Sequence, residues 1–139
     1  MKKNWDDSFE PEMMDFIGKT FTEIKRSDDD RELIFICDEG EFKMHHQQNC
    51  CENVYIEDII GDLSDLIGSP ILIAEEVTSD KNPETVKPET IEYQDCFTWT
   101  FYKFATIKGY VDIRWYGESN GYYSESVDLS FEPKIKEVV

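Results

Sequence analysis

The chain has 139 residues, 40% of them hydrophobic, which suits one domain with a single core. Its 14 basic and 31 acidic residues give a net charge of −17, which argues against general nucleic-acid binding because neutralising phosphates needs a basic surface. Its apolar runs, the longest at residues 33–37 and 71–74, are far shorter than the roughly 20 residues that cross a bilayer. The first residues also lack the apolar stretch of a secretory signal, so we expect a cytoplasmic protein.

The first half of the chain predicts a β-hairpin within a single domain of residues 1–139. Residues 1–14 are expected to form a peripheral arm. Residues 32–37 and 41–46 flank a polar turn that contains Gly40, and residues 20–25 are expected to pair beside this hairpin.

A short helix is predicted next. Apolar residues recur at helical spacing, and Gly68 and Pro70 end the pattern. They are Ile56, Ile59, Ile60, Leu63, Leu66 and Ile67. Residues 79–95 begin with a polar, proline-containing stretch and are expected to form a mobile loop.

The last third of the chain predicts a three-stranded antiparallel meander. Residues 97–101 and 111–115 alternate apolar with polar side chains, which is the period of a half-buried strand. Turns are expected at Lys108-Gly109 and at Asn120-Gly121, followed by a third strand that ends near Phe131. Trp115 is expected in the core.

These elements predict an α+β fold, mainly antiparallel sheet in two hairpin or meander blocks, with one or two short helices. Residues 15–21 recur in outline at 65–71, and residues 52–56 resemble 125–129. Such short matches are consistent with a duplication or with chance.

A histidine- and cysteine-containing segment is the first candidate site, because imidazole and thiolate are zinc ligands. The residues are His46, Gln48, Cys50, Cys51 and Glu52. On a strand, adjacent histidines would point to opposite faces, and structural zinc sites need four ligands of matched spacing. We therefore expect no metal and no other cofactor here. Packed side chains and reduced thiols explain the segment equally well.

Two further groups are candidates for binding. The acidic residues Glu57, Asp58, Asp62 and Asp65 either provide solubility or imitate phosphates. Aromatic and polar side chains gather near the last predicted turn, as in interface hot spots, although a well-packed hairpin has the same composition. These residues are Arg114, Tyr116, Glu118, Asn120, Tyr122, Tyr123 and Glu125.

Residues 50–59, 65–68, 97–103 and 108–125 resemble a family of small acidic proteins of unknown function that occur in bacteriophage and prophage genomes. The resemblance covers residues 15–129 and implies no reaction. Members of this family usually show a His, a Gln and paired Cys residues, and His46, Gln48, Cys50 and Cys51 fit that pattern.

No catalytic constellation is evident, which favours a non-enzymatic function. Our leading hypothesis is a phage-type accessory protein that binds a host protein with a basic surface, such as a defence or nucleic-acid-binding protein, and blocks it as an acidic mimic. Direct contact with nucleic acid or membrane is not expected. The alternative is a small-ligand or metal-binding domain, with its site where residues 46–52 meet residues 114–125. Neither the partner nor the oligomeric state follows from the sequence.

Overall fold

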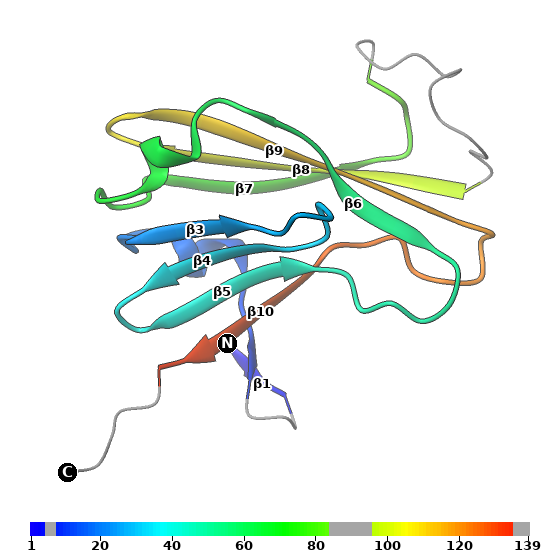
Figure 1. Ribbon diagram of the computed structural model, residues 1–139, viewed down its shortest axis with the longest axis horizontal. Helices are drawn as coiled ribbons and strands as arrows, with labels where there is room; N and C mark the ends of the chain where they lie inside the picture. Colours follow the sequence, from blue (N-terminus) through cyan, green and yellow to red (C-terminus); the bar gives the residue numbers. More distant parts are fainter. Residues whose placement is uncertain (5–7, 84–95, 135–139) are drawn as a thin grey trace.

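Two antiparallel β-sheets stack face to face in the computed structural model, which describes residues 1–4, 8–83 and 96–134 (Figure 1). In spatial order, one sheet contains β1 (Lys2–Lys3), β2 (Phe9–Glu10), β10 (Asp128–Pro133), β5 (Gly40–His45), β4 (Leu33–Cys37) and β3 (Glu23–Arg26). The other contains β6 (Asn53–Ile60), β9 (Gly109–Ser119), β8 (Cys96–Thr106) and β7 (Ile73–Ser79). Helical structure in the described residues is limited to two 3-10 turns, η1 (Met13–Phe16) and η2 (Leu63–Leu66). The predicted antiparallel sheet is confirmed, but the α+β class with short helices overstates the helical content, which in the described residues is these two turns.

Both predicted hairpins are confirmed. β4 pairs with β5 so that Phe35 lies opposite Phe42, and β3 pairs with the other edge of β4 as expected. β8 pairs with β9 along the full length of both strands, with Tyr102 opposite Ile113. Local alternation and glycine-containing turns are sufficient to define such pairs.

The predicted helix at residues 56–67 is wrong, because most of its first half is strand β6. The pairing of β6 with β9 shifts register between Ile56 and Asp58, so Glu57 has no opposite residue. A bulge of this kind inserts one extra residue and reverses the alternation. As a result, Ile56 and Ile59 both pack on the core three residues apart, which imitates helical spacing.

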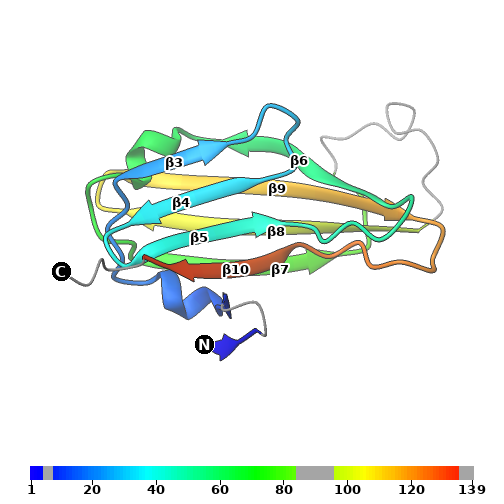
Figure 2. The same ribbon diagram turned by 60° about the horizontal axis from the view of Figure 1, so that its bottom comes forward.

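The predicted third strand of the meander also pairs elsewhere. The chain leaves β9 at Ser119 and crosses to the other sheet, where β10 pairs with β5 and Phe131 lies opposite Phe42. Figure 2 shows β10 beside β5 in this sheet. The Asn120-Gly121 turn therefore starts a connection between sheets and not a tight hairpin.

The internal repeat has a structural counterpart. The repeated segments form η1 and η2, and each is followed by a glycine with positive φ, Gly18 at 85° and Gly68 at 82°. The Gly18 N–H donates to the Ile71 carbonyl and the Gly68 N–H to the Phe21 carbonyl, so the two copies pair crosswise. The other repeated segments lead into β6 and β10. β6 comes from the first half of the chain but pairs with β9 of the second half. β10 comes from the second half but pairs with β5 of the first half.

The core fills the space between the two sheets. Phe16 is fully buried, and its ring lies 4.5 Å from that of Phe42 and 5.3 Å from that of Phe104. Trp115 is 1% exposed in the same cluster, as predicted.

The mobile loop was expected at residues 79–95, and residues 84–95 of it lie outside the described residues. The single domain and its peripheral arm stay predictions. Within the described ranges, no helix has the length and apolar character needed to cross a membrane.

Candidate functional site

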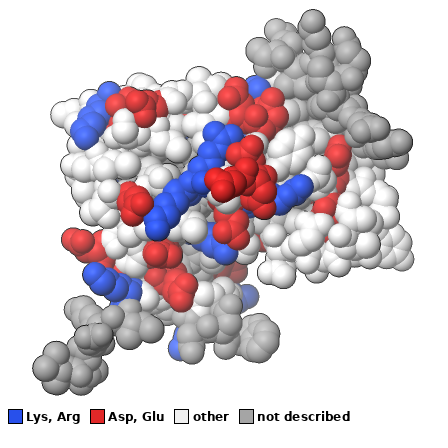
Figure 3. Space-filling view, viewed as in Figure 1, with Lys and Arg blue, Asp and Glu red and all other residues white. Residues whose placement is uncertain are grey.

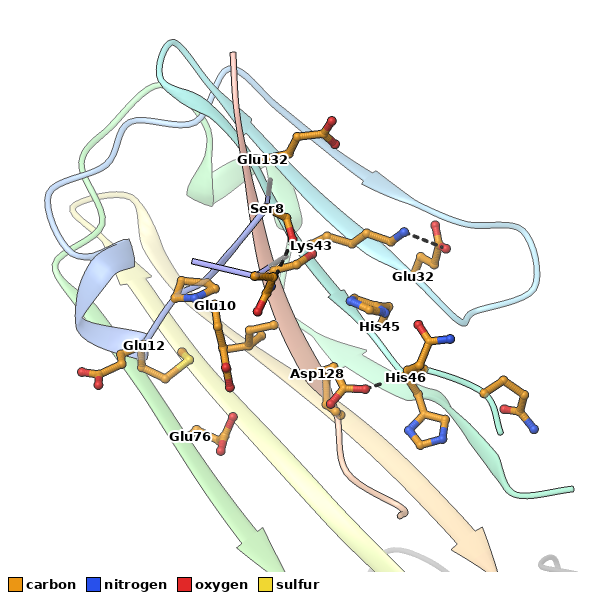
Figure 4. Close-up of a pocket in the computed structure, with 18 residues that line it drawn as sticks. Ser8, Glu10, Glu12, Glu32, Lys43, His45, His46, Glu76, Asp128 and Glu132 are labelled. Atoms are coloured by element: carbon orange, nitrogen blue, oxygen red, sulfur yellow. Dashed lines mark hydrogen bonds and ion pairs between the residues drawn. The ribbon is translucent and has the colours of Figure 1, made fainter. Parts of the chain in front are cut away.

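A groove of about 910 Å³ lies where the N-terminal arm meets β5 and β10 (Figure 4). Its wall includes one lysine, Lys43, and the histidines His45 and His46. Six carboxylates also line it: Glu10, Glu12, Glu32, Glu76, Asp128 and Glu132.

The alternation of β5 and β10 places several of these groups on the outer face of their sheet. Phe42 and Met44 are fully buried, so the residues between and after them, Lys43 and His45, face outward. Asp128 lies directly opposite His45 in the neighbouring strand. The remaining carboxylates come from four places: Glu132 lies on β10, Glu32 directly precedes β4, Glu76 lies on β7, and Glu10 and Glu12 belong to the N-terminal segment.

Acidic side chains outnumber basic ones in the lining of the groove. Lys43 pairs with Glu32 at 3.2 Å, so its charge is already balanced. Burial and the nearby Lys43 lower the pKa of His45, which keeps this ring neutral near pH 7. Figure 3 shows one face of the molecule, on which basic and acidic side chains are interspersed.

Carboxylates from both sheets converge at one side of the groove. Burial, followed by the carboxylates of Glu76 on β7 and Asp128 on β10, raises the pKa of Tyr102. Negative charge from the two sheets is thus concentrated at one edge of the sandwich.

His46 and Glu52 form a buried pair beside this groove, at a second cavity of about 330 Å³. His46 Nδ1 lies 2.8 Å from the Ser126 carbonyl oxygen, which can only accept, so Nδ1 carries a hydrogen. His46 Nε2 then faces Glu52 Oε2 at 3.5 Å, and both atoms are buried without a hydrogen-bond partner among the described residues. A proton on Nε2 or a bound cationic donor would satisfy both acceptors.

Glu52 also fixes the loop that joins β5 to β6. Its Oε1 accepts hydrogen bonds from the Cys50 N–H at 2.7 Å and the Asn49 N–H at 3.1 Å. Burial raises the pKa of Glu52, but these two N–H groups and His46 outweigh it and hold the pKa below its ordinary value. Gln48 Nε2 donates to the Cys50 and Glu52 carbonyls from the other side.

Cys50 and Cys51 stand exposed at the tip of this loop, with their Sγ atoms 3.0 Å apart. Tyr123 lies close enough to Cys50 for this thiol to raise the pKa of Tyr123. The connection between β9 and β10 therefore meets the β5–β6 loop through Tyr123 and Ser126. The structure thus places residues 46–52 beside part of the segment 114–125 that the sequence associated with them.

The other residues of that segment lie elsewhere. Arg114 pairs with Glu57 and lies over the Trp99 ring at 5.5 Å on the outer face of the second sheet. Tyr116 is fully buried there and donates to Glu118.

The remaining members of the segment occupy the connection itself. Glu125 accepts hydrogen bonds from Thr98 and Ser119. Asn120 Oδ1 accepts from the Tyr122 N–H, and the Tyr122 side chain is 89% exposed. The residues of the predicted hot spot are therefore divided between strand β9 and the β9–β10 connection. Tyr122 is the most exposed tyrosine among them.

The acidic residues that the sequence placed on a helix have local structural contacts. Glu57 and Asp58 both pair with Arg114. Asp62 caps η2 by accepting the Ser64 N–H and hydroxyl, which lowers the pKa of Asp62. Asp65 lies against Gly109 in the β8–β9 turn. None of the four lines the groove described above.

The carboxylates that line the groove were not predicted from the sequence. Part of the signal was present, since Glu41, Lys43 and His45 alternate with core residues, as do Asp128, Ser130 and Glu132. Pairing between β5 and β10 joins these two polar rows, and the predicted meander assigned β10 to the wrong neighbour.

Metal binding finds limited support in the geometry. Across residues 1–4, 8–83 and 96–134, no three His, Cys, Asp or Glu side chains group so as to hold an ion. His46 and Glu52 form a pair of potential ligands, with no third ligand grouped beside them in the described ranges.

Comparison with known protein families matches residues 14–129 to a family described as Domain of unknown function (DUF7448). No curated protein and no solved structure matched the chain. The matched residues include β3 to β9, the loop at residues 46–52 and the start of β10. The expected membership of a family of unknown function is thereby confirmed. The chain belongs to the DUF7448 family.

Proposed function

We propose that this protein is a non-enzymatic binding module that takes a basic segment of a partner protein into the groove between its N-terminal arm and strands β5 and β10. The observation that carries this proposal is the lining of the groove, where six carboxylates oppose a single lysine. A surface of one sign attracts an oppositely charged partner over long range and makes association dependent on salt.

The resemblance to small acidic proteins of phage and prophage genomes supports a host protein as the partner. We propose that the two proteins meet in the host cytoplasm and that binding covers a basic surface, such as the nucleic-acid-binding face of a defence protein. Acidity then acts as a local mimic of phosphate charge, confined to the groove and independent of Asp58, Asp62 and Asp65.

Neutralising the groove should weaken binding of a fluorescein-labelled oligolysine peptide, measured by fluorescence anisotropy. The variant combines Glu10→Gln, Glu76→Gln and Glu132→Gln, three exposed carboxylates of the lining. Each exposed ion pair contributes about 0.2–1 kcal/mol. We therefore expect about a tenfold loss of affinity, and a flatter dependence on salt.

The matched control changes net charge equally but leaves the groove intact. It combines Glu23→Gln, Asp28→Asn and Glu75→Gln, all exposed and outside the lining. We expect less than a twofold loss in this control. Equal losses in both triple variants, or no binding by the unaltered protein at low salt, would reject the groove as the site.

A small-ligand or metal site at His46 and Glu52 is the second candidate, favoured by their unpartnered buried atoms. Since the pair has no third ligand among the described residues, elemental analysis of protein purified without added metal should find no stoichiometric zinc. One equivalent of zinc that Glu52→Gln removes would favour this candidate over the groove.

A further inference from the structure

Two adjacent thiols are held side by side on the surface, outside the lining of the acidic groove. Cys50 and Cys51 are both exposed, and their Sγ atoms are 3.0 Å apart. Two sulfurs that each bond one central atom at about 2.3 Å, the length of a zinc–thiolate bond, lie roughly 3–4 Å apart. The pair is therefore spaced to bond one atom together.

The surrounding loop holds this arrangement in place. Glu52, which is 3% exposed, accepts the Cys50 N–H, and Gln48 donates to the Cys50 carbonyl. His46 Nδ1 donates to the Ser126 carbonyl at 2.8 Å, which ties the β9–β10 connection to the same loop. Contacts from both connections thus order the backbone that carries the two thiols.

A disulfide is the less favourable use of this geometry. Consecutive Cα atoms across a trans peptide bond are about 3.8 Å apart, whereas disulfides usually join Cα atoms about 4.4–6.8 Å apart. The described residues contain no cis peptide bond. Closing a bond between Cys50 and Cys51 would require the backbone to move, but chelating a third atom would not.

The identity of that atom follows from the protonation and number of the ligands. A divalent cation needs deprotonated thiolates and further ligands, and the described residues offer no group of three. A trivalent metalloid can condense with two protonated thiols and needs no additional protein ligand.

We propose that Cys50 and Cys51 form a chelating dithiol site for thiophilic trivalent metalloids of the arsenite class. With phenylarsine oxide as the probe, two S–As bonds form and the As–O double bond breaks. The two thiol protons leave with the oxide oxygen as one water molecule. Arsenic stays trivalent, so no oxidant or reductant is required.

The test uses the full-length protein, reduced with a phosphine and then freed of reductant, with phenylarsine oxide binding followed by intact mass and by titration of free thiols. We expect one equivalent to bind and two of the four thiols to be lost. Cys50→Ser and Cys51→Ser should each weaken binding at least about 100-fold, since chelation makes the second bond intramolecular.

The chain supplies its own controls in Cys96 and the buried Cys37. Cys96→Ser should bind phenylarsine oxide as the unaltered protein does. Cys37→Ala should also bind phenylarsine oxide as the unaltered protein does. Its unfolding midpoint shows whether any loss of binding in this variant is due to unfolding. Full binding by Cys50→Ser or Cys51→Ser, or an equal loss in Cys96→Ser, would overturn the proposal. So would the absence of binding in the unaltered protein.

Discussion

Trp115→Ala should lower the free energy of unfolding by about 3–5 kcal/mol, the cost of removing a large aromatic side chain from a core. Trp115 is 1% exposed and lies opposite Ile56 of β6 and Thr100 of β8, in the middle of the second sheet. Both neighbouring strands are fixed by pairing, so they can collapse only partly into the cavity left behind. Urea denaturation measures this loss in the free energy of unfolding, with circular dichroism as the signal in place of tryptophan fluorescence.

Two further variants separate packing from other effects. Trp115→Phe should cost less than Trp115→Ala, because it keeps an aromatic ring and the indole Nε1 that it removes has no hydrogen-bond partner within the part of the chain that the structure describes. Tyr110→Ala, on the same strand but 62% exposed, should cost less than about 1 kcal/mol. A loss below about 1 kcal/mol for Trp115→Ala would show that this residue is not part of the core.

Replacing Glu52 should disturb the loop at residues 46–52 and change the response of the protein to acid. Glu52→Ala removes the acceptor for the Asn49 and Cys50 N–H groups and leaves His46 Nε2 facing a cavity. We expect the unfolding midpoint to fall by several degrees in thermal denaturation. Glu41→Ala, at an exposed position of β5, is the control and should change it little.

The sign of the acid dependence follows from the pKa of Glu52, which lies below its ordinary value of 4.5 in the folded protein. A carboxylate of this kind stabilises the fold above the unfolded-state pKa, and this stabilisation is lost as pH falls through the folded-state value. Glu52→Gln cannot titrate, so its stability should fall less steeply with acid. Urea midpoints from neutral pH to about pH 3 test this. Parallel acid dependence in both proteins would contradict it.

The sequence by itself determined the two hairpins. In β4, in β5 and over residues 111–115 of β9 the residues alternate between core and surface, and each hairpin is joined by a short turn that ends in glycine. These features are local, so they need no knowledge of the rest of the fold. The position of Trp115 in the core follows from the same alternation.

Two predictions from the sequence were wrong, the helix at residues 56–67 and the pairing of the last strand. In both places the tertiary structure departs from the local sequence pattern. The bulge at Glu57 brings Ile56 and Ile59 to one face, and apolar spacing then imitates a helix. Asn120-Gly121 is a sound turn motif, yet a turn does not specify which sheet receives the following strand. β10 pairs with β5 because Phe131 can pack against Phe42 there, with ring centroids 4.7 Å apart.

Of the two candidate sites, one could be predicted from the sequence and the other could not. Residue types alone identified His46, Cys50, Cys51 and Glu52 as a group, since they are close in the chain and chemically distinctive. The acidic groove could not be predicted, because its carboxylates come from the arm, from residues near β4, from β7 and from β10. Short-range patterns fix which residues face outward, but only the pairing of strands and the stacking of sheets decide which outward residues become neighbours.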